Sequence, residues 1–147
     1  GVSIAEHFDW RTWQPTQRIG PFIVRSVPVA HPVEAYGIRV EEGRPGGGTM
    51  VYSGDTGPSE DLVQFAGGVD LLLVESAFLD GPDNPPGMHL SGAQAAAIGQ
   101  AAGVGAVVIT HIPPWHEPQR VLAEAVPHFD GPVSLATPGA SWEISSY

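Results

Sequence analysis

The sequence has 147 residues, which is enough for one domain with a buried core. Hydrophobic residues make up 42% and charged residues 15%, a composition that indicates a globular rather than a disordered chain. No apolar run approaches the ~20 residues that span a bilayer, and no basic-then-apolar signal segment opens the chain. Cysteine is absent, which excludes disulfides and thiolate metal ligands and leaves His and carboxylates. We therefore expect a cytoplasmic protein without a membrane partner.

The net charge is −10, and all six basic residues are arginine. Such an acidic domain lacks the basic surface of a nucleic-acid binder, so we do not expect nucleic acid as a partner. Bound cations could still reverse the potential locally.

The first part of the chain predicts three strands. Residues 21–31 are rich in β-branched residues, with Pro28 near the end of the strand. Residues 36–42 predict a second strand and residues 49–53 a third. The segment GRPGGG between them, residues 43–48, predicts a turn. We expect these three strands to form a meander.

From residue 58 onward, helix and strand patterns alternate, which predicts an α/β fold. Apolar runs at 69–76 and 104–110 are typical of buried strands. Three helices are predicted, with N-cap residues at Ser59 and Ser91 and Pro118 in the first turn of the third. Helices covering one side of a sheet leave the other side in need of a partner. The predicted helices are 58–68, 91–103 and 117–129, and two short strands are predicted at 132–137 and 141–146.

Four polar residues lie beside the ends of these strands: His31, Asp55, His89 and His111. Strand ends that feed helices form the usual rim of an α/β site, and rigid elements hold site residues well. His and Asp suit Zn²⁺, Mn²⁺ or Fe. The spacing along the chain is not diagnostic, and Asp55 by itself is also a common turn residue.

Two other chemistries fit the sequence less well. A serine triad would need Ser53 or Ser91 with a His and Asp55, but neither serine lies in a G-x-S-x-G elbow. The segment GRPGGG has no Lys and no helix after it, so it is interpreted as a hairpin turn and not as a phosphate loop.

Four segments in order resemble a known family: HPVEAYGIRV, YSGDTG, LLLVESAFLDG…MHLSGAQAA and VVITHIPP. Together they are similar to the second half of the metallo-β-lactamase superfamily, in its RNase Z-like branch, and within it most of all to the actinobacterial cyclic-nucleotide phosphodiesterases. The resemblance covers roughly residues 18–135 and implies an αβ/βα sandwich, of which this chain supplies the second sheet and its covering helices. The H-x-H-x-D-H motif of the first half is absent. We therefore expect residues 1–147 to be the C-terminal portion of a single metallo-β-lactamase-fold domain, with the missing N-terminal half as a partner.

The resemblance also implies roles for five residues. His31 and His111 are expected to be metal ligands, and Asp55 is expected to bridge two divalent ions, most readily zinc, with manganese or iron as alternatives. His89 is expected to protonate the leaving oxygen as a catalytic residue, and Glu75 to orient His89. The cations would activate water and offset the charge on phosphate oxygens.

The function that follows is a binuclear phosphodiesterase acting on a small phosphodiester such as a cyclic nucleotide, with this fragment inactive alone. Bacterial RNase Z enzymes carry a tRNA-gripping arm where this chain has only EEGRPGGG, residues 41–48. An RNase Z-like RNA-processing nuclease remains an alternative. So does a non-catalytic binding or assembly module, which would pair with a separate N-terminal chain, or with itself as a homodimer, through the uncovered sheet face.

Overall fold

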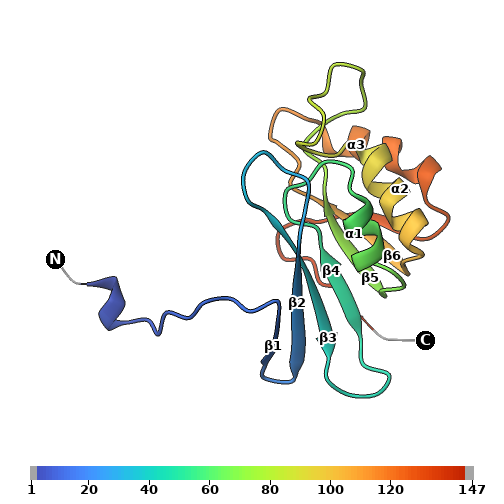
Figure 1. Cartoon of the computed structure of the whole chain (residues 1–147). Coiled ribbons are helices and arrows are strands. Elements are labelled where there is room, and N and C mark those ends of the chain that lie inside the picture. The colour runs from blue at the N-terminus through green and yellow to red at the C-terminus, as the bar shows by residue number, and fades with distance from the viewer. Residues whose placement is uncertain (1–2, 145–147) are drawn as a thin grey trace.

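The computed structural model describes residues 3–144. Seven strands form one sheet in which spatial order follows chain order (Figure 1). Three α-helices connect the last four strands, and two short 3-10 helices lie outside the sheet. The strands are β1 (Thr16–Ile19), β2 (Phe22–Pro28), β3 (Tyr36–Glu42), β4 (Thr49–Tyr52), β5 (Leu71–Glu75), β6 (Ala106–Thr110) and β7 (Val133–Leu135), and the helices are η1 (Ile4–Glu6), α1 (Glu60–Phe65), α2 (Gly92–Ala102), α3 (Pro118–Ala125) and η2 (Val126–His128).

The direction of the strands changes at β4. Strands β1 to β4 are antiparallel neighbours, as predicted for the meander, whereas β4 to β7 run parallel. Parallel neighbours need a crossover connection, and α1, α2 and α3 supply one each. Because β2 and β4 are both antiparallel to β3, the strands β2, β4, β5 and β6 all end at the same edge of the sheet.

The predicted helix starts are present. The Ser59 side chain accepts a hydrogen bond from the Leu62 N–H, and Ser91 forms a capping box with Gln94. Helix α2 ends at Ala102 and is capped by Gly103, which adopts a left-handed conformation. These local contacts satisfy backbone groups that would otherwise lack partners at the helix ends.

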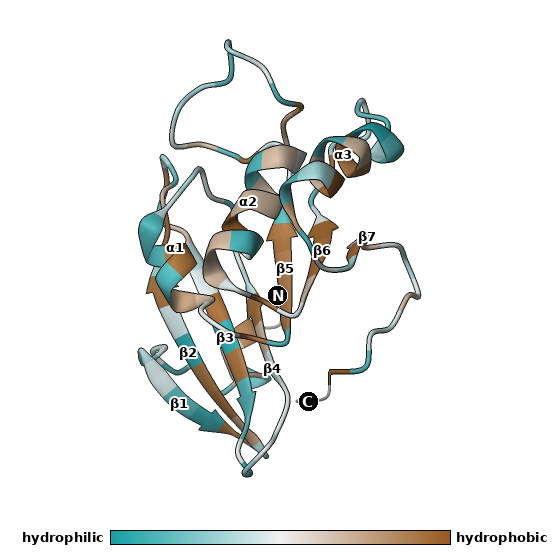
Figure 2. Cartoon of the chain, turned by 90° about the vertical axis from the view of Figure 1, so that its right-hand side faces the viewer, coloured by the Kyte–Doolittle hydropathy of each residue, from teal (hydrophilic) through white to brown (hydrophobic). Residues whose placement is uncertain are grey.

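The hydrophobic core lies between the helices and one face of the sheet (Figures 1 and 2). Val51, Leu72 and Val107 are register neighbours on β4, β5 and β6, and all three are fully buried. Small residues bring α2 close to the sheet, because a Cβ at Gly99 would lie 2.5 Å from Cγ2 of Val107. Full burial of an aliphatic side chain stabilises the fold by about 1.5–3 kcal/mol, so this layer holds the parallel strands in register.

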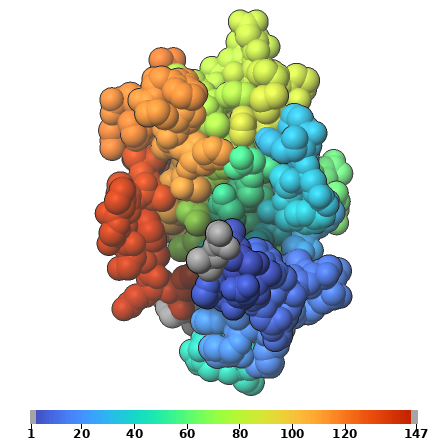
Figure 3. Space-filling model, turned by 90° about the vertical axis from the view of Figure 1, so that its left-hand side faces the viewer, coloured from blue at the N-terminus to red at the C-terminus, as the bar shows by residue number. Residues whose placement is uncertain are grey.

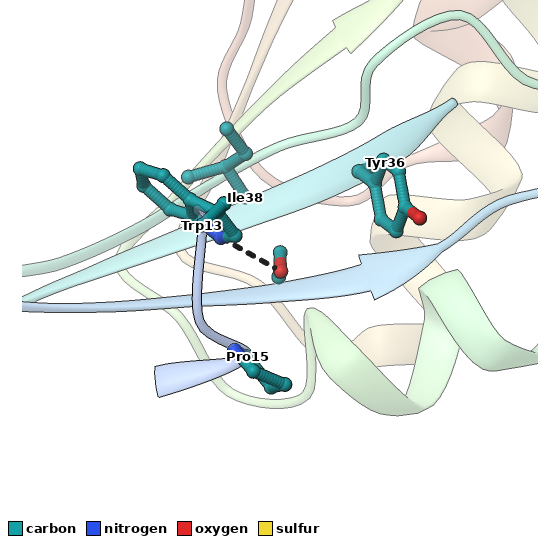
Figure 4. A pocket seen from close by; sticks show the side chains of 5 residues that line it. Trp13, Pro15, Tyr36 and Ile38 are labelled. Atoms are coloured by element: carbon teal, nitrogen blue, oxygen red, sulfur yellow. Dashed lines mark hydrogen bonds between the residues drawn. The ribbon is translucent and has the colours of Figure 1, made fainter. Parts of the chain in front are cut away.

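Among residues 3–144, the α-helices all lie on one face of the sheet (Figure 1), and other segments cover the opposite face only in part (Figure 3). A row of half-buried residues crosses four strands there: Ser26, Ile38, Tyr52 and Leu73. Trp13, from the segment before β1, lies over this row and donates a hydrogen bond from Nε1 to Oγ of Ser26 at 3.0 Å (Figure 4). A hollow of about 450 Å³ remains, lined by Trp13, Pro15, Ser26, Tyr36 and Ile38. The predicted one-sided helical cover is therefore confirmed.

Three details differ from the sequence prediction. Strand β1 was not predicted; it forms a hairpin with β2 through Gly20, whose φ of +57° a glycine adopts without strain. The strand predicted at 141–146 is wrong for residues 141–144, which form no strand; residues 142–144 instead line a hollow with Asp70 and Gly105, beside the starts of β5 and β6. The rest of that segment lies outside the described residues. The third helix is α-helical only to Ala125 and continues as η2, since Pro127 has no N–H to donate.

Within residues 3–144, no helix is both long and apolar enough to cross a membrane. The cytoplasmic location stays a prediction.

Candidate metal centre

The four polar residues predicted at strand ends meet at one edge of the sheet. His31 follows β2, Asp55 follows β4, His89 lies between β5 and α2, and His111 follows β6 directly. They come together because the strands before them all run in the same direction. We call this group, His31, Asp55, His89 and His111, the candidate metal centre.

The side chains of the candidate metal centre are in contact. Nδ1 of His111 lies 2.7 Å from Oδ1 of Asp55. The ring of His89 lies between those of His31 and His111, with centroid separations of 5.4 Å and 5.5 Å. Nδ1 of His31 lies 3.2 Å from the carbonyl oxygen of Val33, a contact in which this nitrogen donates and leaves Nε2 free to accept. Three imidazoles and a carboxylate thus share one half-exposed cluster.

Asp55 owes its position to the backbone before it. Gly54 has a φ of +64°, and a Cβ there would lie 2.4 Å from the carbonyl oxygen of Tyr36. Only glycine fits this turn. The backbone on either side is anchored to β5, since Ser53 N–H donates to the Leu73 carbonyl at 3.0 Å and Thr56 N–H donates to Oε1 of Glu75 at 2.9 Å. The carboxylate of Asp55 therefore projects from a fixed loop.

His111 has an unusual backbone conformation. Its φ is +55°, the one positive value among the non-glycine residues that the structure describes. This left-handed conformation costs roughly 1–2 kcal/mol for an L-residue. The adjoining strand holds it in place, because Ser76 N–H donates to the Thr110 carbonyl at 2.9 Å. Strain of this kind is typical of functional positions.

Glu75 lies beneath the cluster and is fully buried. Its Oε1 accepts the Thr56 N–H at 2.9 Å and contacts Nδ1 of His89 at 2.6 Å. Its Oε2 accepts the Ala77 N–H at 2.9 Å and the Leu90 N–H at 3.2 Å. Each carboxylate oxygen thus has two partners, and Nδ1–H of His89 is directed at the acid.

The side chains of Glu75, His89 and His111 can each place one ligand atom within 4.8 Å of the others, so these three residues also form a possible metal site. This trio shares only His111 with the predicted ligands His31, Asp55 and His111. Both oxygens of Glu75 are already occupied by hydrogen bonds, which a metal would have to displace. We therefore prefer Asp55, which is about 39% exposed, to Glu75 as the carboxylate ligand.

Two neighbours were missed by sequence reasoning. Burial raises the pKa of Tyr52 at the end of β4, and the nearby charges of Asp55 and Glu75 raise it further. The phenol of Tyr52 thus lies near the carboxylates of Asp55 and Glu75. Phe78 contacts the ring of His89 edge-on at 5.2 Å. Tyr52 stands in the segment YSGDTG and Phe78 in LLLVESAFLDG, but nothing in either segment indicates a contact with the candidate metal centre.

Comparisons with known proteins agree with the fold. The family model described as a beta-lactamase superfamily domain matches residues 3–112. The chain belongs to this superfamily. It is 40% identical to an uncharacterized protein of Mycobacterium leprae over 141 residues, which are 95% of this chain and 49% of that protein. It is 31% identical to the probable metallo-hydrolase YhfI of Bacillus subtilis, over 89% of this chain and 53% of that protein.

Further matches include ribonuclease Z of Bradyrhizobium diazoefficiens, 39% identical over 82 residues, 54% of this chain and 27% of the enzyme. The crystal structure of B. subtilis YhfI superposes with a TM-score of 0.82 at 30% identity, covering 89% of this chain and 54% of YhfI. The short form of human tRNase Z superposes with a TM-score of 0.65 at 19% identity, over 88% of this chain and 47% of that chain, and supports the fold alone. The chain spans about half the length of the curated relatives it matches. The predicted superfamily, RNase Z-like relationship and α/β fold are confirmed.

Proposed function

We propose that residues 1–147 supply one half of a binuclear, metal-dependent phosphodiesterase that acts on a small phosphodiester such as a cyclic nucleotide. The observation that carries this proposal is the contact between Asp55 and His111 beside the rings of His31 and His89. A carboxylate among imidazoles at a sheet edge is the donor set that zinc and similar cations prefer. The name of YhfI as a probable metallo-hydrolase supports the hydrolytic class.

In this proposal, His31, Asp55 and His111 hold two divalent cations, zinc first and manganese or iron as alternatives. When bound, the cations would activate water and offset the charge that develops on phosphoryl oxygens. The chain's own contribution is to orient the proton donor. Glu75 fixes Nδ1–H of His89, so that doubly protonated His89 would direct its Nε2–H at the leaving oxygen and become neutral as it delivers that proton, a contribution of typically 10²–10⁴-fold.

The ligand set in this chain is incomplete. No H-x-H-x-D-H motif occurs in the sequence, and the matched relatives are about twice as long. We propose that an N-terminal half of the same fold stacks on the uncovered sheet face around Ser26, Ile38, Tyr52 and Leu73. The chain alone would then be inactive.

Two features favour a small substrate over RNA. The connection between β3 and β4 is a tight turn, closed by the Glu42 N–H donating to the Gly48 carbonyl at 3.0 Å. A turn of this length offers no arm to grip a folded RNA. The net charge of −10 opposes binding to a long phosphate backbone. The match to ribonuclease Z over part of the chain keeps RNA processing as the second candidate.

The test is to measure bound metal and hydrolysis together, for the chain alone and for the chain joined to its natural upstream sequence. The substrates are bis-(p-nitrophenyl) phosphate, cyclic AMP and a tRNA precursor. The proposal expects about two metals per molecule and turnover of the first two substrates only in the longer form, with both properties abolished by Asp55→Ala.

Cleavage of the tRNA precursor without cyclic AMP turnover would favour the nuclease. A longer form that binds no metal and hydrolyses none of the substrates would contradict the enzyme proposal and favour a binding or assembly module.

A further inference from the structure

A separate hollow of about 350 Å³ adjoins the candidate metal centre on the side of β7. His111 belongs to the hollow and to the candidate metal centre, since it lines the hollow and its Nδ1 lies 2.7 Å from Oδ1 of Asp55. The other walls come from the residues that end and follow β6 and β7, and from Pro118 at the start of α3. A group that occupies this hollow would therefore lie beside the candidate ligands.

The hollow exists because β6 and β7 separate after their last paired residues. Ile109 pairs with Leu135, and the Ala136 N–H donates to the Ile109 carbonyl at 2.7 Å. Beyond this pair, the left-handed backbone at His111 turns the chain that follows β6 away from the chain that follows β7. On the β7 side, the chain enters a turn in which the Ala140 N–H donates to the Thr137 carbonyl at 3.0 Å.

The walls of the hollow are stiff. Pro118 occupies the first turn of α3, and Pro138 stands in the turn after β7, and each proline fixes its own φ. The loop after His111 is closed by the His116 N–H, which donates to the Pro113 carbonyl at 3.0 Å. A preformed hollow of this kind loses little conformational entropy when a ligand enters.

The chemistry of the lining is apolar with a polar margin. Ile112, Leu135 and Pro138 contribute hydrocarbon, while Thr110 and Thr137 contribute hydroxyls that can donate or accept a hydrogen bond. None of the lining residues is Asp, Glu, Lys or Arg. The hollow therefore offers no Lys or Arg to pair with a second anionic group of a substrate. The net charge of −10 on the chain further disfavours such a group.

We infer that this hollow receives an uncharged, ring-containing organic group of the substrate, of nucleobase size, while the phosphoryl group lies at Asp55 and His111. The inference rests on the proposed function and narrows it, because it selects a nucleoside phosphodiester over a compact, multiply charged diphosphate. Volumes from about 300 Å³ upward, apolar walls and a few polar groups are the usual properties of small-molecule sites.

The test uses adenosine, which has the ring but no phosphate, so binding is measured independently of metal and hydrolysis. Backbone amide shifts of the 147-residue chain are followed by NMR during titration with adenosine and, separately, with inorganic diphosphate. We expect adenosine to shift the amides of Ile112 and Thr137. Thr137→Trp, and independently Pro138→Trp, should fill the hollow and weaken adenosine binding at least tenfold.

The matched control is Ala140→Trp, an exposed position in the same turn that does not line the hollow. It should leave adenosine affinity unchanged, and thermal melting should show all three variants folded.

The inference is overturned if adenosine does not shift the amide signals of the lining residues, if both filling variants bind adenosine as well as the control does, or if diphosphate produces those shifts instead. Adenosine binding without any hydrolysis by the longer form would support the hollow as a binding site and contradict the proposed activity. Hydrolysis without adenosine binding would support the proposed activity and contradict the role of the hollow.

Discussion

Nδ1 of His89 lies 2.6 Å from Oε1 of Glu75, and the carboxylate that holds this imidazole is fully buried. The same acid accepts backbone N–H groups from three loop residues, so one side chain ties together the segments after β4, after β5 and before α2. The orientation of the proposed proton donor and the stability of the fold therefore depend on the same group.

Glu75→Gln should destabilise the chain. The new amide N–H₂ replaces an acceptor, so at least one buried N–H loses its partner, at a cost of about 1–3 kcal/mol. Urea denaturation at neutral pH measures the change. Glu117→Gln is the control, because Glu117 is exposed and makes no capping hydrogen bond through its side chain; it should change stability by no more than ~0.5 kcal/mol. Equal stability of both variants would mean that Glu75 does not accept these bonds.

Asp55→Asn should separate metal binding from folding. Asp55 is half-exposed, so its replacement should hardly change the melting temperature without metal. In the form joined to its upstream half, zinc at 100 times its dissociation constant should stabilise the native protein by about 2.7 kcal/mol, and the variant should lose this gain. Asp83→Asn, in an exposed loop, should keep it. Undiminished zinc stabilisation in Asp55→Asn would remove Asp55 from the ligand set.

Gly54→Ala should be much more harmful than Gly20→Ala. Both residues have positive φ, +64° and +57°, so both alanines suffer the same backbone penalty of about 1–2 kcal/mol. Only at Gly54 would the new Cβ meet a backbone atom, the Tyr36 oxygen at 2.4 Å; at Gly20 nothing lies within 4 Å. Chemical denaturation should give a clearly larger loss for Gly54→Ala, and a loss no larger than at Gly20 would show that the Asp55 loop relaxes freely.

Substitutions at His111 should separate the energetic cost of its backbone conformation from the role of its side chain in metal binding. Asn tolerates the left-handed conformation, so His111→Asn should keep the stability of the metal-free chain within about 0.5 kcal/mol. The β-branched His111→Val should lose roughly 1–2 kcal/mol. Both should lose zinc binding in the longer form, measured by metal analysis. If Val and Asn are equally stable, the left-handed conformation carries no cost at this site.

Acidification should weaken a carboxylate contact on the helix-covered face. Burial opposes ionisation of Glu41, but hydrogen bonds from Arg25 and Arg39 outweigh it and hold the pKa of Glu41 below its ordinary value of 4.5. The pKa of Glu41 is thus lower in the folded chain than in the unfolded chain. Ionised Glu41 therefore stabilises the fold fully above pH 4.5, and this stabilisation is lost as the pH falls through the pKa of the folded state. Glu41→Gln should therefore lower the melting temperature at pH 7 and have a smaller effect at pH 3. A constant difference across that range would contradict the assignment.

Much of the fold could be predicted because its signals are local. Apolar runs marked β5 and β6, and the caps Ser59 and Ser91 marked the starts of α1 and α2. Strand β1 could not be predicted, since TQRI has little strand character of its own and forms through pairing with β2. The strand predicted at 141–146 does not form in the described residues 141–144, which instead pack beside Asp70 and Gly105.

By itself, the sequence determined the order of helices and strands and put His31, Asp55, His89 and His111 beside strand ends, because hydrophobic period, caps and glycines act over a few residues. Only the tertiary structure decided that these ends share one edge, because that depends on the reversal of direction at β3 and the parallel pairing of β4 to β6. It also decided how fully the oxygens of Glu75 are occupied and that a hollow opens beside His111. Both depend on contacts between residues far apart in the chain, which packing of the whole sheet selects.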